Sequence, residues 1–115
     1  MAIKRNGVGP HYSEVIEHNG ILYLSGQVNT DTDEIRTQSR AVFAEIDKLL
    51  EENGSNKEHI LFVTLYLSDA ANFDGMNAEW DTWLPEGKRP ARACIVTGMA
   101  VPGILLEVVV TAAKK

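Results

Sequence analysis

The segment Ile60–Leu67 constrains the fold of this chain more than any other stretch of its sequence. Its residues, ILFVTLYL, carry no charge and are rich in β-branched and aromatic side chains, which favour extended structure. Strands with one solvated face alternate apolar and polar side chains, and this one does not, so we predict a strand buried on both faces. The run is also far shorter than the roughly 20 apolar residues of a membrane-spanning helix.

Turn and helix signals divide the rest of the chain. Asn19-Gly20 suits a two-residue hairpin turn, because both residues accept positive φ. Asp31 and Glu34 stand at capping-box-like spacing before an apolar stripe of 3.6-residue period, and Asn53-Gly54 supplies a left-handed stop after it. Together with a second helical stripe that contains Asn77, Trp80 and Trp83, these signals predict strands at 12–18, 21–25, 60–67, 91–97 and 104–112 and helices at 33–52 and 73–84.

The predicted order ββαβαββ indicates an α+β fold, with one mainly β sheet covered on one face by two helices. The 115 residues suffice for one core, so we expect a single domain, 1–115. The strands at 60–67 and 104–110 carry more apolar positions than a two-layer domain with a solvated sheet face would hide. We therefore expect the exposed sheet face to form the interior of an oligomer.

Charge and cysteine content exclude several function classes. The net charge is −5 and no basic run exceeds Lys88-Arg89, so we expect no nucleic-acid partner, although the cations around Arg92 suit a small anion. Cys94 is the single cysteine, which excludes an intrachain disulfide and a cysteine-pair zinc site. The histidines are scattered, and no metal site is expected. Without a signal-like or membrane-spanning segment, the expected location is the cytoplasm.

Arg92 and Glu107 are charged residues inside otherwise small or apolar strands. Arginine binds carboxylates through a planar fork and stays charged when partly desolvated, so Arg92 is the candidate ligand-binding residue. Alternation places Leu105, Glu107 and Val109 on one face, where Glu107 either points to solvent or is buried with a partner. An Arg92–Glu107 ion pair between neighbouring strands is the structural alternative, and the pattern does not separate these possibilities.

The remaining candidate residues carry weaker signals. Cys94 lies between Ala93 and Ile95 with no general base nearby, which favours an inert core thiol over a nucleophile. Trp80 and Trp83 are expected in the core or an interface. Ser25, at a strand end, lacks the G-x-S-x-G context of a serine hydrolase.

Several motifs in combination resemble the Rid family, the YjgF-type reactive-intermediate deaminases. They cover nearly the whole chain and are Gly9-Pro10-His11-Tyr12-Ser13, Ser25-Gly26-Gln27, the helix 77–83, Pro90-Ala91-Arg92-Ala93-Cys94 and Leu106-Glu107-Val108. Within the family, Asn56-Lys57 and the pair of tryptophans look most like the YoaB-like branch.

The resemblance implies a chorismate-mutase-like fold of the bacillus type, assembled as a homotrimer with sites between subunits and no metal or cofactor. By family correspondence, Arg92 binds the substrate carboxylate and Glu107 positions the attacking water. Tyr12, Ser25, Gly26 and Cys94 correspond to residues that line the pocket. His11 departs from the family's usual Gly-Pro-Tyr, so Tyr12 aligns by its distance to Ser25.

The activity implied is hydrolysis of a 2-imino acid or its enamine tautomer, such as 2-aminoacrylate, to a 2-keto acid and ammonia. The alternative is a non-catalytic module that binds a keto acid in the same trimer clefts. Glu107 favours catalysis over this alternative, because a nearby negative charge does not help to bind a carboxylate ligand. Ribonuclease activity has been ascribed to relatives and is the least favoured, because the chain is acidic.

Overall fold

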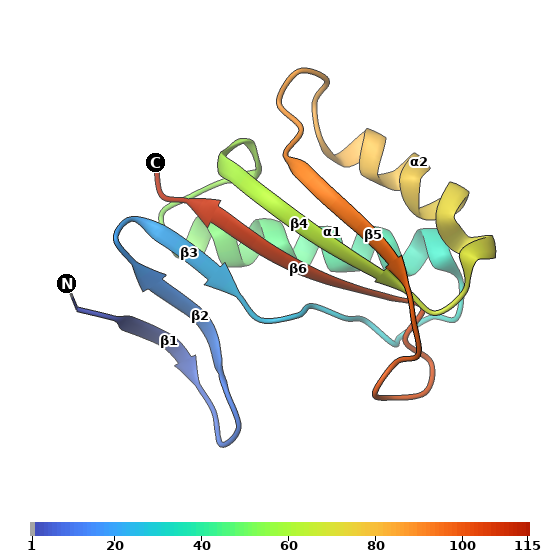
Figure 1. The fold of residues 1–115 in the computed structure, drawn as a ribbon, viewed down its shortest axis with the longest axis horizontal. Helices are drawn as coiled ribbons and strands as arrows, with labels where there is room; N and C mark the ends of the chain where they lie inside the picture. Colours follow the sequence, from blue (N-terminus) through green and yellow to red (C-terminus); the bar gives the residue numbers. More distant parts are fainter. Residues whose placement is uncertain (1) are drawn as a thin grey trace.

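The computed structural model describes residues 2–115, and the predicted α+β fold is confirmed there (Figure 1). One sheet carries two helices and two short 3₁₀ turns. In chain order the elements are β1 (Lys4–Val8), β2 (Ser13–His18), β3 (Ile21–Leu24), α1 (Ile35–Glu52), η1 (Lys57–His59), β4 (Ile60–Leu67), η2 (Ala70–Asn72), α2 (Phe73–Trp83), β5 (Ala91–Val96) and β6 (Leu106–Ala113).

The six strands form one mixed sheet in the order β1-β2-β3-β6-β4-β5. All neighbours are antiparallel except β4 and β5, which run parallel because α2 carries the chain back between them. The final strand, β6, therefore lies in the middle of the sheet. This order places β4 between β5 and β6, so the strands that carry Arg92 and Glu107 are not neighbours.

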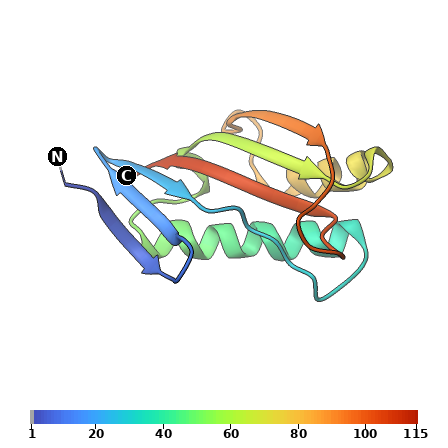
Figure 2. The same ribbon diagram turned by 60° about the horizontal axis from the view of Figure 1, so that its bottom comes forward.

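Both helices cover the same face of the sheet, and the core lies between these two layers (Figure 2). Strand β6 alternates strictly, with every second side chain buried against the helices. Helix α1 supplies the predicted apolar stripe, including Val42, Phe43 and Ile46, which are at most 2% exposed. The periodicities of 2 and 3.6 residues that were visible in the sequence are thus the contact faces of the two layers.

The opposite face of the sheet is covered by no element of the described chain (Figure 2). Strand β4, predicted to be buried on both faces, is buried only at alternate positions on the helix side. On the open face Phe62 is 44% exposed, and Ile95 of β5 and Tyr23 of β3 are exposed to a similar degree. The apolar content of β4 therefore exceeds what one copy of the chain hides.

Strand β1 is missing from the predicted order, which becomes βββαβαββ. This edge strand pairs only with β2 among the described elements, and four of its five residues are exposed. Its sequence, KRNGV, has no apolar alternation, and Gly7 adopts φ +65° against the side chain of Glu14. An edge strand held by backbone pairing alone leaves no periodic signal in the sequence.

The helix boundaries follow local capping. The hairpin turn at Asn19 and Gly20 has positive φ at both residues, and Gly54 ends α1 with φ +80°, as predicted. The N-cap of α1 is Glu34 itself, whose carboxylate accepts hydrogen bonds from the amides of Arg36 and Thr37. The expected reciprocal pairing of Asp31 with Glu34 does not form, because the Asp31 amide bonds to the side chain of Asn29.

Candidate functional site

Arg92 lies on the edge strand β5 and points to the helix side of the sheet. Its guanidinium carbon sits 4.9 Å from the ring centroid of Trp80 and 5.9 Å from that of Phe73, both on α2. Its Nη1 is buried, and no acceptor for it is found within residues 2–115. No carboxylate of the described chain lies within 4.0 Å of the group. Arg92 is thus a partly buried cation with one buried, free donor.

Asn77 is a site residue that the sequence analysis did not single out. It lies on the helix face that carries Phe73 and Trp80, since positions i, i+4 and i+7 align. Its Oδ1 is buried and, like Arg92 Nη1, has no partner among the described residues. The signal was present in the sequence as a polar residue within the apolar stripe of the second helix. This surface therefore presents one unpaired donor and one unpaired acceptor.

Cys94 follows Arg92 by two residues on the same face of β5 and packs against the core. Burial raises the pKa of the Cys94 thiol, against the opposing effect of the Arg92 charge. The thiol is therefore protonated at neutral pH, which agrees with the prediction that Cys94 is not a nucleophile. We call Arg92, Cys94, Phe73, Asn77 and Trp80 the Arg92 half-site.

Glu107 lies on the open face of β6, with Val109 on the same face as predicted. Both line a hollow of about 300 Å³ together with Tyr66 of β4 and the loop 97–100. Glu107 pairs with Tyr66 across the ladder and forms no ion pair within residues 2–115. Of the two positions considered for this carboxylate, the one facing away from the core is correct.

Ser25 and Gly26 bring the chain after β3 alongside Glu107. The Ser25 hydroxyl donates to the Ser13 carbonyl at 2.6 Å, and its amide donates to the Glu14 carbonyl at 2.9 Å, so both groups hold the segment in place. Gly26 lies directly against Glu107, because a Cβ at this position would overlap the carboxylate. The next residue, Gln27, is bonded in both directions to the backbone of Val108.

Tyr12 lies just before β2 and next in the chain to Ser13, to which Ser25 is bonded. Its side chain is 67% exposed and lines a separate open hollow with His11 and Glu14. We call Tyr12, Ser25, Gly26 and Glu107 the Glu107 half-site. Backbone contacts near Ser25 connect this group, although the Tyr12 ring does not line the hollow next to Glu107.

The two half-sites do not meet within one chain. Arg92 faces the helices and Glu107 faces the open side, and the intervening Tyr66 pairs with Glu107 on one edge and with Ile95 on the other. Arg92 is three residues from Ile95, which separates it from Glu107 by about 10 Å across the strands and about 10 Å along them. The alternative prediction of an Arg92–Glu107 ion pair is therefore wrong, because strand β4 and the thickness of the sheet lie between the two side chains.

The loop that borders the Glu107 hollow is tied to α1 by the fully buried side chain of Gln38. Its Nε2 donates to the carbonyls of Thr32 and Gly103, and its Oε1 accepts from the Leu105 amide. These three bonds connect the loop before α1 and the loop before β6 to one helix position. The signal for this role in the sequence is limited to a polar residue next to the apolar stripe of the first helix.

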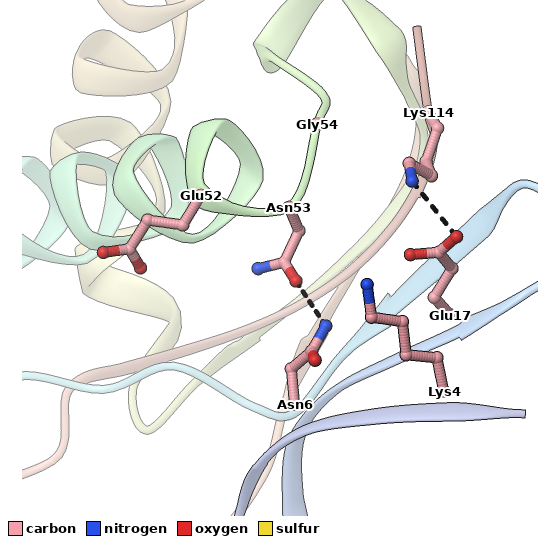
Figure 3. A pocket seen from close by; sticks show the side chains of 7 residues that line it. All are labelled: Lys4, Asn6, Glu17, Glu52, Asn53, Gly54 and Lys114. Atoms are coloured by element: carbon pink, nitrogen blue, oxygen red, sulfur yellow. Dashed lines mark hydrogen bonds and ion pairs between the residues drawn. The ribbon is translucent and has the colours of Figure 1, made fainter.

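A larger hollow, of about 440 Å³, lies away from both half-sites, near the C-terminal end of α1 (Figure 3). Its polar groups are largely paired with one another: Lys114 contacts Glu17 at 3.1 Å, and Asn6 donates to Asn53 at 2.6 Å. Within residues 2–115 no three His, Cys, Asp or Glu side chains gather as metal ligands. Among the same residues, no helix is long and apolar enough to span a membrane.

Comparison with known proteins gives one consistent result. The family model described as Endoribonuclease L-PSP matches residues 4–114. A RutC family protein of Haemophilus ducreyi is 40% identical over 112 residues, 96% of either chain, and the RutC family protein YoaB of Escherichia coli K12 is 37% identical over 114 residues, 98% of this chain and 99% of its own. A YjgF family member from Neisseria meningitidis has a crystal structure that matches with a TM-score of 0.97 at 39% identity, covering 100% of this chain and 97% of that one. The chain therefore belongs to the Rid (YjgF/RutC) family, as its motifs predicted, with YoaB among its relatives.

Proposed function

We propose that this protein is a deaminase that hydrolyses 2-imino acids, or their enamine tautomers of the 2-aminoacrylate type, to 2-keto acids and ammonia. The observation that carries the proposal is the buried, unpaired Nη1 of Arg92. A buried guanidinium donor without a partner is costly unless a ligand supplies an acceptor, and the planar fork of Arg92 matches the α-carboxylate of such a substrate.

In the proposed reaction Arg92 holds the substrate carboxylate and Glu107 holds the attacking water. Glu107 takes a proton from the water as the water oxygen bonds to the C=N carbon, and passes this proton to the nitrogen to give a carbinolamine. The carbinolamine hydroxyl then gives up its proton to the nitrogen through Glu107 as the C–N bond breaks, so ammonia leaves. The C=N bond is replaced by C=O, so no electrons are transferred and no cofactor enters any step. Because such imines also hydrolyse unaided, orientation and proton transfer suffice, the latter contributing about 10² to 10⁴-fold.

We propose further that the active unit is a homotrimer in which one copy supplies the Arg92 half-site and its neighbour supplies the Glu107 half-site. Two features support this: the half-sites face opposite sides of the sheet, and the apolar open face is uncovered in a single copy. We also propose the cytoplasm as its location, since a reducing compartment suits the free thiol of Cys94.

The activity is tested by following keto-acid formation from freshly generated 2-iminobutanoate. Arg92→Ala should raise KM by about 10- to 150-fold, the worth of hydrogen bonds to a charged group. Glu107→Gln should lower kcat by about 10² or more. Arg89→Ala is the matched control, because Arg89 is also a cation near β5 but contacts Asp81 at 3.7 Å on the surface. Parent protein that does not accelerate the reaction would refute the deaminase proposal.

Two other outcomes identify the alternatives. Calorimetric binding of 2-ketobutyrate that depends on Arg92, with no turnover of imine, would make the protein a carboxylate-binding module. The matching family model is named for an endoribonuclease, so RNA cleavage is assayed in parallel. We expect none at physiological salt, because a net charge of −5 disfavours contact with a phosphate backbone.

The shared site is tested with mixed trimers. Arg92→Ala and Glu107→Gln chains carrying different tags are co-expressed and purified through both tags, so each trimer contains both variants. A cyclic trimer of this kind has about one site in three with an intact Arg92 and an intact Glu107. We therefore expect about a third of the parent activity from two inactive variants. Mixed trimers as inactive as each variant alone would place both residues of a site in one chain.

A further inference from the structure

The guanidinium of Arg92 contacts aromatic rings, whereas a partly buried arginine is more commonly paired with a carboxylate. The ring of Trp80, only 3% exposed, lies 4.9 Å from the guanidinium carbon, and the ring of Phe73 lies 5.9 Å from it. Both distances fall within the range in which a ring face attracts a cation. The rings come from the same face of α2, about two turns apart, so one rigid helix presents both rings to one side chain.

The carboxylates on α2 that form ion pairs are engaged elsewhere. Glu79, next in sequence to Trp80, is held from α1 by Arg40 at 3.2 Å and Arg36 at 3.8 Å. Asp81 contacts Arg89 at 3.7 Å. Neither is paired with Arg92, so a ligand carboxylate that reaches Arg92 has no ion pair to displace.

We propose that Trp80, assisted by Phe73, is a positioning residue that holds the Arg92 guanidinium in its ligand-binding orientation. This inference rests on the proposed function and adds to it a role for a residue expected only to fill the core or an interface. The ring attracts the cation without using any of its N–H donors. The guanidinium is therefore held in place while Nη1 stays free for the ligand.

The expected effect follows from the strength of cation–π contacts, which corresponds to about 2- to 30-fold in an equilibrium constant. Trp80→Leu removes the ring and should weaken the binding of 2-ketobutyrate to the assembled protein by that factor. Trp80→Phe keeps a ring face and should stay within about twofold of the parent. Without the ring of Trp80, the Arg92 side chain is ordered only when the ligand binds. The entropy lost in that ordering lowers the affinity for the ligand.

Trp83→Leu is the matched control. Trp83 lies on the same helix, but it stacks on Phe43 at 4.4 Å and donates to Asp47 and does not lie over Arg92. Its loss should lower the melting temperature and leave the affinity for 2-ketobutyrate within about twofold of the parent. A role of Trp80 in core packing alone would make the two leucine variants behave alike.

A second readout does not depend on the ligand. In the NMR spectrum of the free protein, the ring current of Trp80 should move the chemical shift of the Arg92 Hε proton away from its usual value. This change in shift should disappear in Trp80→Leu and persist in Trp83→Leu. Should Trp80→Leu not fold, Phe73→Leu replaces it, since Phe73 is 39% exposed, and a partial change in the shift with about twofold weaker binding is expected.

Folded Trp80→Leu protein that binds 2-ketobutyrate as tightly as the parent would overturn the inference, and so would an unperturbed Arg92 Hε in the parent. An unchanged shift and affinity in Phe73→Leu, where that variant is needed, has the same meaning. A different result is a parent protein that shows the shifted Hε signal but binds no 2-ketobutyrate. It would overturn the proposed function, and with it the positioning role of Trp80.

Discussion

Replacing Gly26 by alanine should displace the Glu107 carboxylate and leave the fold intact. A Cβ at Gly26 would overlap Oε2 of Glu107 and lie 3.0 Å from its Cδ and 3.2 Å from its Cγ. Gly26 is not among the residues with positive φ, so the added methyl group strains no backbone torsion. The whole perturbation therefore falls on one side chain of the proposed site.

The magnitudes for stability and activity should differ widely. Glu107 borders an open hollow, so its flexible side chain can rotate away, and the expected destabilisation is about 1 kcal/mol, the lower end of the range for overpacking. If Glu107 positions the water, a displaced carboxylate loses most of the benefit of proton transfer, about 10² or more in kcat.

Urea unfolding and keto-acid formation from 2-iminobutanoate measure the two effects. Gly98→Ala is the control, because Gly98 lines the same hollow but a Cβ there meets nothing within 4 Å. It should match the parent in both assays. Gly26→Ala protein with parental turnover would refute the reasoning, since the contact with Glu107 would then have no bearing on catalysis.

Gln38→Leu should destabilise the fold by about 3 kcal/mol, roughly 1 kcal/mol for each of its three loop-tethering hydrogen bonds, as measured by urea unfolding. Asp47→Asn keeps an acceptor for Trp83 and should stabilise the protein at pH 7 but not at pH 3. Burial raises the pKa of Asp47 above 3.8, so the folded state keeps the proton to higher pH than the unfolded state does. The stability of the parent protein therefore falls as pH rises through this pKa. Melting curves across pH that show no such trend would contradict this prediction. Alkylation of Cys94 by iodoacetamide should become fast only at pH values above the usual thiol range, and Arg92→Ala should slow it further at a given pH, because the Arg92 charge lowers the Cys94 pKa.

The elements that were predicted correctly are those whose signals are local. The hairpin turn at Asn19 and Gly20, the stop at Gly54 and the alternation along β6 depend on backbone preferences or on the period of one element. Strand β1 left no such signal, because its side chains are mostly exposed and only pairing with β2 makes it a strand. The N-cap at Glu34 was misassigned for a related reason: several polar residues near 31–34 can cap, and the path of the loop selects one.

For the candidate site, the sequence by itself determined which residues are proposed to act. Arg92 and Glu107 stood out because a charge inside an apolar strand needs a purpose or a partner, and the motifs around them identified the family. Tertiary structure alone decided their geometry. The position of β4 between β5 and β6 and the packing of α2 over β5 place Arg92 under Trp80 and Glu107 on the open face. Strand order and the outward face of an edge strand depend on contacts between residues far apart in the chain, which no local pattern contains.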